Sequence, residues 1–217
     1  MPKADTIDPK FRSYVETTYS PIPKDQFEKI IDNYVSLIEL AGERRQSMDA
    51  ILEQACRIIF RQFGFREILI GLKSREDFHY RYEKLFGVGS ESTDVYKKVR
   101  YTTEDMVSQE RFPHIKTGKL SELDPVEGLP EYEKDLFSKK FRLGEARKSQ
   151  DEFHEGDYFD VWIHGNNGDL VGWVELLNPS DGKLPPRSTI RWIELLASIL
   201  GAIITQRWAE EDSAKKR

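Results

Sequence analysis

Four histidines are the first side chains to consider for chemistry, because imidazole moves protons near neutral pH and binds metal ions. They are His79, His114, His154 and His164. None of them shares a metal-ligand spacing such as His-x-x-x-His, and the chain has neither His-Glu-x-x-His nor the Gly-x-Ser-x-Gly sequence of many hydrolases. We therefore expect each histidine to be a surface or strand residue, and we predict no catalytic residue and no metal site.

The carboxylates Glu152, Glu155, Asp157 and Asp160 form the densest acidic group that could do acid–base chemistry. They straddle an expected loop and the start of an expected strand, which favours a solvated face. Cys56 is the single cysteine, so an intramolecular disulfide and a cysteine-built zinc site are both excluded. It lies in an apolar helical pattern, where a cysteine packs as a small hydrophobic residue.

Residues 165–186 hold the densest turn signal, and a glycine-rich loop of this kind can bind phosphate. Such a loop needs backbone amides that converge at a helix N-terminus. Here Asn167-Gly168 separates two strand-like runs, and Pro185-Pro186, which lack amide hydrogens, precede the next helix. Hairpin chemistry is the better interpretation.

The overall composition indicates a folded, soluble protein. Hydrophobic residues make up 38% of the chain, the net charge is −5 and the isoelectric point is about 5.6. An acidic chain disfavours binding to nucleic-acid phosphates. The beginning of the chain has no apolar run, and the apolar window at 192–204 is interrupted by Glu194 and is too short to span a bilayer. We expect a cytoplasmic protein that binds neither nucleic acid nor membrane.

Periodicity predicts a loose arm over 1–23 and an N-terminal helical segment over 24–46. A globular part over 47–208 and a polar tail over 209–217 follow. The expected elements are helices over 24–41, 47–63 and 187–208 and strands over 66–73, 78–86, 158–164 and 170–177. Residues 87–156 are less regular. They hold a strand that passes into a helix capped by Thr102 within 95–109, a helix over 129–141 and an exposed strand over 145–153. This order predicts an α+β fold in which flanking helices cover an antiparallel sheet.

Two stretches resemble a GAF domain, "MDAILEQACRIIFRQFGFREILIGLKSREDFHYRYEKLFGVG" at the front and "GDYFDVWIHGNNGDLVGWVELLNPSDGKLPPRSTIRWIELLASILGAII" at the back. The resemblance implies a six-stranded antiparallel sheet with helices on one face, preceded here by an N-terminal helical arm. It also implies a small-molecule pocket on the other face, closed by the middle segment, and a sensory role, commonly as a dimer. Family members that reduce methionine sulfoxide or attach a bilin use pocket cysteines, and Cys56 alone departs from both patterns.

The candidate ligand-binding residues come from strand alternation and from this resemblance. In 158–164 the residues Phe159, Val161 and Ile163 are expected to pack under the helices. Their neighbours are expected to face the pocket, and the family geometry adds residues of the middle segment. The full set is Tyr158, Asp160, Trp162, His164, Tyr101, Arg111, Phe112 and His114. The alternatives are that the middle segment covers these residues without a ligand, or that they are solvated. Which face of the strand 170–177 turns to the core stays open, because Trp173 and Glu175 share a face. The cofactor is unknown.

The helix 187–208 carries two apolar stripes, of which the sheet can cover only one. One stripe is Ile190, Ile193, Ala197, Leu200 and Ile204; the other is Trp192, Leu195, Ile199 and Ile203. The second stripe meets either the 24–41 helix of its own chain, with Phe27, Ile31, Tyr34 and Ile38, or a second copy in a homodimer. The leading hypothesis is a stand-alone sensor that signals to a partner protein in trans. A scaffold module with a degenerate pocket and an enzyme acting on a small metabolite are the alternatives.

Overall fold

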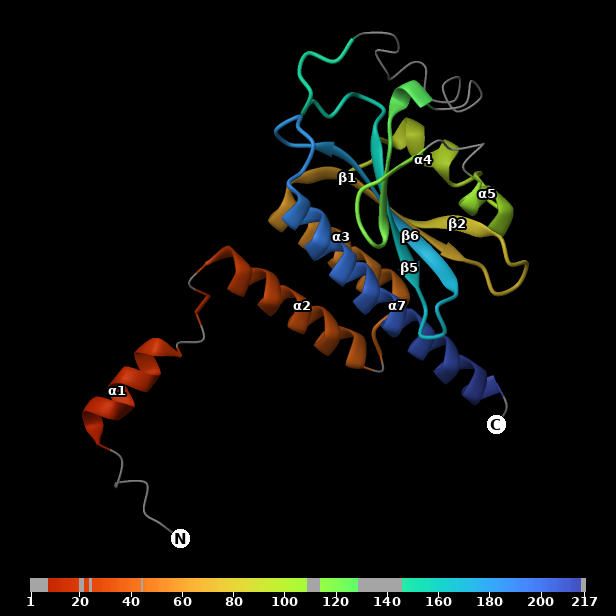
Figure 1. Ribbon diagram of the computed structural model, residues 1–217. Coiled ribbons are helices and arrows are strands. Elements are labelled where there is room, and N and C mark those ends of the chain that lie inside the picture. Colours follow the sequence, from red (N-terminus) through yellow and green to blue (C-terminus); the bar gives the residue numbers. More distant parts are fainter. Residues whose placement is uncertain are drawn as a thin grey trace.

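The protein is built around one antiparallel sheet, seen in the computed structural model, which describes residues 8–19, 22–23, 25–43, 45–108, 114–128 and 146–215. Six strands follow the order β2-β1-β6-β5-β4-β3 (Figure 1). Their bounds are β1 Phe65–Lys73, β2 Tyr80–Phe86, β3 Ile115–Lys116, β4 Ser121–Asp124, β5 Tyr158–His164 and β6 Leu170–Pro179. The four long strands confirm those predicted from the sequence, and the predicted α+β class is confirmed.

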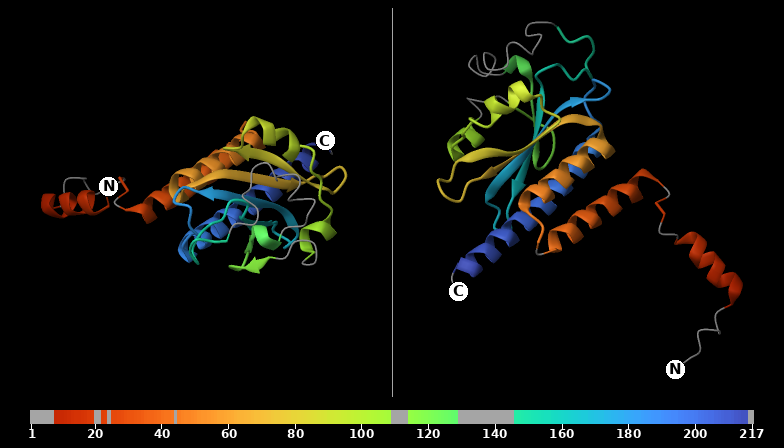
Figure 2. Two further views of the ribbon diagram at one scale, coloured as in Figure 1. Left: turned by 90° about the horizontal axis from the view of Figure 1, so that it is seen from above. Right: turned by 180° about the vertical axis from the view of Figure 1, so that it is seen from behind.

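Two helices, α3 (Met48–Phe63) and α7 (Arg187–Lys215), cover one face of the sheet (Figures 1 and 2). Ser47 caps α3 as expected, since its side chain accepts a hydrogen bond from the amide of Ala50, and Gly64 ends the helix at φ 73°. The core lies between these helices and the inward side chains of β1, β5 and β6. The helix α7 extends to Lys215, beyond the end expected at residue 208.

The helix α2 (Gln26–Gly42) forms an outer layer against α3 and α7. Its Tyr34 hydroxyl donates a 2.6 Å hydrogen bond to the carbonyl of Trp192. The Trp192 ring also contacts Tyr34 and Phe27, each at 6.2 Å between ring centroids. The N-terminal part of the second α7 stripe is therefore covered within the chain. By length and composition α7 passes a test for a membrane span, but half of its apolar window is buried inside the fold.

The sequence interpretation of 1–23 as a loose arm is wrong for its central part. Pro9–Thr18 forms the helix α1, with Asp8 as its N-cap and Pro9 in its first turn. No residue of α1 is buried, and the helix projects away from the rest of the protein in both figures. Local capping signals are therefore sufficient to define a helix there.

The middle segment confirms some of the expected elements. The expected helix is α5 (Thr103–Val107), which Thr102 caps in a reciprocal capping box with Asp105. The strand expected ahead of Thr102 is wrong, because Val95 and Tyr96 belong to the helix α4 (Ser90–Tyr96) and Tyr101 forms an isolated bridge with Tyr80. The exposed strand expected over 145–153 is wrong, because only Glu152 forms an isolated bridge there, with Lys183. The helix expected over 129–141 lies outside the described residues.

The glycine-rich connection between β5 and β6 is a hairpin loop, as predicted. The Gly165 amide donates to the carbonyl of Asp169 over 2.8 Å, and Gly168 has φ 80°. Asn167 does not have a positive φ, and the loop comprises the five residues 165–169 between β5 and β6.

Candidate functional site

The face of the sheet turned away from α3 and α7 carries the residues predicted to face a pocket. Along β5, Phe159, Val161 and Ile163 are buried in the core, and Tyr158, Asp160, Trp162 and His164 are partly buried on the opposite face. The predicted alternation of β5 is confirmed. Whether these four residues touch a ligand remains a prediction.

One half of this face is filled by aromatic side chains around Trp173. The ring of Trp173 lies 5.0 Å from Tyr82 and 6.0 Å from Tyr101, measured between centroids. Tyr82 in turn contacts Tyr96 of α4 at 5.1 Å. The predicted site residue Tyr101 therefore joins this cluster, and it is held there by reciprocal backbone hydrogen bonds with Tyr80.

The facing of β6, which the sequence left open, follows from a buried carboxylate. Glu175 is 6% exposed, and the Tyr82 hydroxyl donates a 2.7 Å hydrogen bond to its Oε2. Burial, followed by the nearby Glu175, holds the pKa of Tyr82 well above its ordinary value, so the phenol remains a donor. Trp173 and Glu175 share the face of the aromatic cluster, and Val174 and Leu176 enter the core.

A row of three carboxylates crosses the other half of the face. In the strand register, Asp160 of β5 lies opposite Glu175 of β6 on one side and opposite Glu122 of β4 on the other. His114, a predicted site residue, lies with its Nε2 3.2 Å from Glu122. The structure thus brings His114 and Asp160 to the same region. The predicted residues Arg111 and Phe112 lie outside the described residues.

Other histidines have structural contacts. His164 Nδ1 lies 2.9 Å from the carbonyl of Gly168, so it supports the hairpin loop at the end of the face. His154 is neither a surface nor a strand residue, contrary to the prediction, because it is 6% exposed in the connection before β5. Within the described residues, no three His, Cys, Asp or Glu side chains are arranged as metal ligands.

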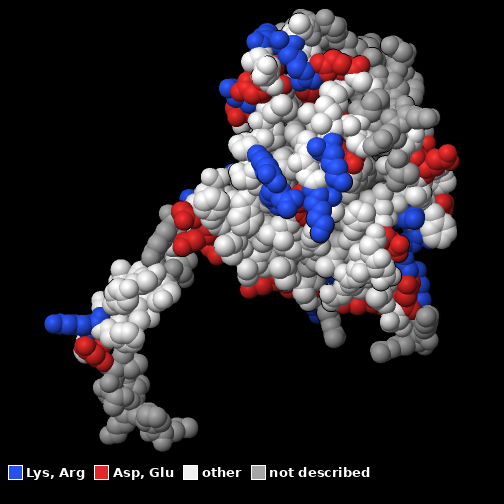
Figure 3. Space-filling model, in the orientation of Figure 1, with Lys and Arg blue, Asp and Glu red and all other residues white. Residues whose placement is uncertain are grey.

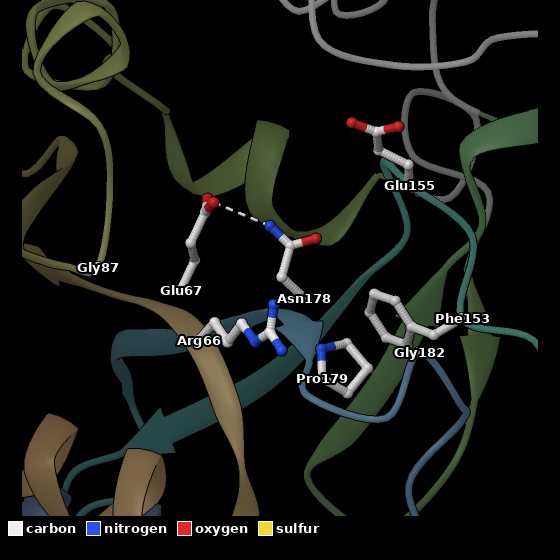
Figure 4. Close-up of a pocket in the computed structure, with 8 residues that line it drawn as sticks. All are labelled: Arg66, Glu67, Gly87, Phe153, Glu155, Asn178, Pro179 and Gly182. Atoms are coloured by element: carbon white, nitrogen blue, oxygen red, sulfur yellow. Dashed lines mark hydrogen bonds between the residues drawn. The ribbon is translucent and has the colours of Figure 1, made fainter.

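A cavity of about 440 Å³ lies at the end of the sheet where β1 begins and β6 ends (Figure 4). It is lined by Arg66, Glu67, Gly87, Phe153, Glu155, Asn178, Pro179 and Gly182. Asn178 donates from Nδ2 to Glu67 Oε1 over 2.8 Å and holds a left-handed φ of 51°. Asparagine tolerates this conformation better than most residues. Figure 4 shows the Glu67 and Glu155 carboxylates and the Arg66 guanidinium around this opening.

None of the predicted site residues lines this cavity. The sequence signal for it was the run Asn178-Pro179-Ser180-Asp181-Gly182, which was interpreted only as a turn. The cavity depends on contacts between distant segments, since Phe153 donates its amide to Gly182 over 2.9 Å and Leu184 donates to Asp151 over 2.7 Å. Those contacts join the connection before β5 to the connection before α7.

A buried ion pair fixes the connection that supplies Phe153 and Glu155. Asp157 is fully buried and accepts hydrogen bonds from Arg147 at 2.6 and 2.8 Å. It also accepts from the amides of Val126 at 3.0 Å and His154 at 2.7 Å. The hydrogen bonds of Arg147 to Asp157, and after them those to Glu127, raise the pKa of Arg147. The expectation that Asp157 belongs to a solvated acidic face is wrong, because Arg147, ten residues earlier, neutralises it.

Cys56 lies on α3 in the core, on the face of the sheet opposite the aromatic cluster. Its side chain is fully buried, and burial, followed by the charge of Glu53, raises its pKa to about 12. A thiol in this environment packs as an apolar group and is a poor nucleophile.

No model of a protein family matches the chain, and no curated protein matches it. Solved structures do match it in fold. The GAF domain of A. aeolicus nlh2 is 11% identical, with TM-score 0.53 over 84% of this chain and 99% of that one. A GAF domain/HD domain protein from Geobacter sulfurreducens is 12% identical, with TM-score 0.51 over 78% of this chain and 96% of that one.

The GAF domain of a putative sensor histidine kinase from Pseudomonas syringae pv. tomato is 12% identical, with TM-score 0.50 over 96% of this chain and 99% of that one. The shared features are the antiparallel sheet and the helices that accompany it. The chain therefore has a GAF-like fold.

Proposed function

We propose that this chain is a sensory domain that binds a small molecule and passes a conformational signal to a partner protein in trans. The observation that carries the proposal is the cavity of about 440 Å³ at the open end of the sheet, within the size range of small-molecule sites. The sensor histidine kinase with a similar fold supports a sensory role.

A route from the cavity to a helix supports the signalling part of this proposal. Asn178 and Pro179 line the cavity at the end of β6, and the chain continues from there into α7 at Arg187. Closure of Glu155 and Phe153 over a ligand would pull on two backbone hydrogen bonds, from Phe153 to Gly182 and from Leu184 to Asp151. These bonds join the connection before β5 to the connection before α7. A small shift at the cavity is then transmitted to a long helix, which is a common route of switching.

The test is ligand-dependent stabilisation of the purified protein against a panel of metabolites, preceded by native mass spectrometry of protein from its own source. A specific ligand raises the melting temperature according to RT ln(1 + [L]/Kd). Arg66→Gln removes a charge from the lining of the cavity. Arg61→Gln is the matched control, because it removes the charge of an exposed arginine on α3, outside the cavity lining. The proposal requires weaker stabilisation in the first variant only, and equal stabilisation in both would refute the cavity as the site.

An interaction module without a ligand is the second candidate, and one observation favours it. Trp173, Tyr82 and Tyr101 fill half of the pocket-facing sheet with protein side chains. A panel that produces no stabilisation, together with a native mass equal to that of the chain alone, would select this candidate.

We also propose a homodimer formed through the N- and C-terminal helices. The support is apolar surface that the chain leaves exposed, on α2 and at Leu195 of α7, which is 45% exposed. Isologous dimers are the commonest assembly of this kind. Sedimentation of the intact protein at tens of micromolar tests this proposal, and a clean monomer would refute it.

A further inference from the structure

Most of the exposed large apolar side chains among the described residues are concentrated on α1, on α2 and between them. They are Phe11, Tyr14, Tyr19, Ile22, Phe27, Ile31, Val35 and Ile38, exposed by 46 to 76%. Figure 3 shows that the visible surface of α1 and α2 is largely uncharged, with acidic residues at the edge of α2. Exposed apolar side chains gathered in this way mark an interaction site.

On α2 this surface is a second stripe beside the one packed against α7, and Phe27 at its N-terminal end also contacts Trp192 of α7. Ile30, Tyr34 and Leu37 are buried. Phe27, Ile31, Val35 and Ile38 follow one another at intervals of three or four residues, and each is about half exposed. Such spacing places them along one side of the helix.

On α1 the residues Phe11, Tyr14 and Val15 lie on one side of the helix at the same spacing. No residue of α1 is buried, and Phe11 and Tyr14 are 60% and 65% exposed. The ten residues of α1 span about 15 Å, and the α2 stripe from Phe27 to Ile38 spans about 16 Å. The apolar stripe of α1 itself, from Phe11 to Val15, spans about 6 Å, so α1 can cover part of the α2 stripe.

The charges beside the two stripes are opposite. By helical geometry Glu28, Asp32 and Glu39 form a row directly beside the apolar stripe of α2. Lys10 and Arg12 lie on either side of the apolar stripe of α1. An α1 helix laid on α2 thus buries apolar side chains and brings either Lys10 or Arg12 to the acidic edge of α2, which favours this pairing.

The α1 helix does not cover α2 of its own chain, from which it projects away (Figures 1 and 2). Ile22, between the two helices, is 73% exposed, and Pro23 fixes its own φ and disfavours a helical conformation at Ile22. We infer that α1 of one copy packs on the exposed stripe of α2 in a second copy, and that the second copy does the same in return. This exchange rests on the proposed homodimer and assigns its surfaces, and reciprocity forms the same contact twice in each dimer.

Sedimentation equilibrium of the full chain tests the apolar surfaces. Phe11→Glu on α1 and Ile31→Glu on α2 are each expected to weaken the dimer at least tenfold, because a charge would be buried in the contact. Ser13→Glu and Ser36→Glu place the same charge on the opposite sides of the two helices and are expected to leave the dissociation constant within twofold. A dimer unchanged by Phe11→Glu overturns the exchange but leaves the homodimer intact, and a monomeric parent protein overturns both.

A disulfide trap distinguishes exchange from an α1 that folds back on its own chain. In a Cys56→Ala background, the double variant Tyr14→Cys/Val35→Cys is expected to form a covalent dimer on mild oxidation. The control Ser13→Cys/Val35→Cys is expected to form far less of it. An internal disulfide within a monomer would overturn the exchange, as would equal cross-linking of the two variants.

Discussion

Gly71 and Trp173 are partners across β1 and β6, and the indole of Trp173 lies directly over the α-carbon of Gly71. A β-carbon on Gly71 would lie 2.0 Å from the outer ring of that indole. Because Gly71 has no side chain, Trp173 can lie flat against β1 and contact Tyr82 and Tyr101. The aromatic cluster that fills half of the pocket-facing sheet depends on this glycine.

Gly71→Ala should consequently destabilise the protein by roughly 1–3 kcal/mol, the range seen when a packed core receives an extra methyl group. Trp173→Phe removes the outer ring atoms that the new methyl group would meet. The double variant should then show a favourable coupling energy in a double-mutant cycle measured by urea denaturation. Strict additivity of the two substitutions would contradict the proposed contact.

The buried Asp157 provides a second prediction. In Asp157→Asn the side-chain amide nitrogen replaces one carboxylate oxygen, and each of those oxygens accepts from one backbone amide and one Arg147 nitrogen, so the buried donors at that position are left unpaired. We expect a loss of roughly 3 kcal/mol in the free energy of unfolding, at the lower end for a broken buried pair because Arg147 keeps Glu127. Glu155→Gln, an exposed carboxylate of the same segment, is the control and should change stability little.

The sequence predicted the parts of the fold that are set by local patterns. Strand alternation placed Phe159 and Val161 inside, and a serine N-cap and a glycine end defined α3 correctly. The alternation pattern did not reveal which residues of β6 enter the core, because a strand covered on both faces has no polar face. The sequence interpretation also failed for α1, where scattered prolines hid a short capped helix.

Prediction of the candidate site was limited by long-range contacts. Asp160 and His114 were placed near each other, as expected from the resemblance. The cavity, by contrast, joins Glu67 to Asn178 across 111 positions of sequence, and a single sequence carries no signal for that pairing. Asp157 was predicted to be solvent-exposed, because a cluster of acidic residues does not indicate which of its members forms an ion pair with an arginine.

Cys56 supplies a prediction about pH. Its pKa in the folded protein is raised to about 12 from an ordinary value of 9.0, so the unfolded chain releases this proton first. The contribution of Cys56 to stability is thus complete below pH 9 and is lost as the pH rises toward 12, by up to about 1.4 kcal/mol per pH unit. Cys56→Ala lacks this loss, although it costs about 1 kcal/mol at neutral pH.

The measurement is the difference in unfolding free energy between Cys56→Ala and the parent at several values of pH. Taking the difference removes other groups, such as Tyr34, whose pKa is also raised by burial. The gap between the two proteins should narrow above pH 9. A constant gap would mean that the thiol ionises as easily in the folded protein as in the unfolded chain.

The last prediction concerns how the sheet holds the end of α7. Arg75, in the hairpin between β1 and β2, pairs with Glu211 at 3.1 Å and with Asp212, and its guanidinium lies 5.8 Å from the Trp208 ring centroid. These contacts lie in the part of α7 that extends beyond the core, where helix ends fray most readily. Arg75→Gln should therefore accelerate amide hydrogen exchange over 208–215 and leave the exchange of β5 and β6 unchanged. Arg57→Gln, which removes an exposed pair with Glu53 on α3, is the control. If exchange at the end of α7 is the same in both variants, the hairpin does not hold the helix, and a signal through α7 must act without it.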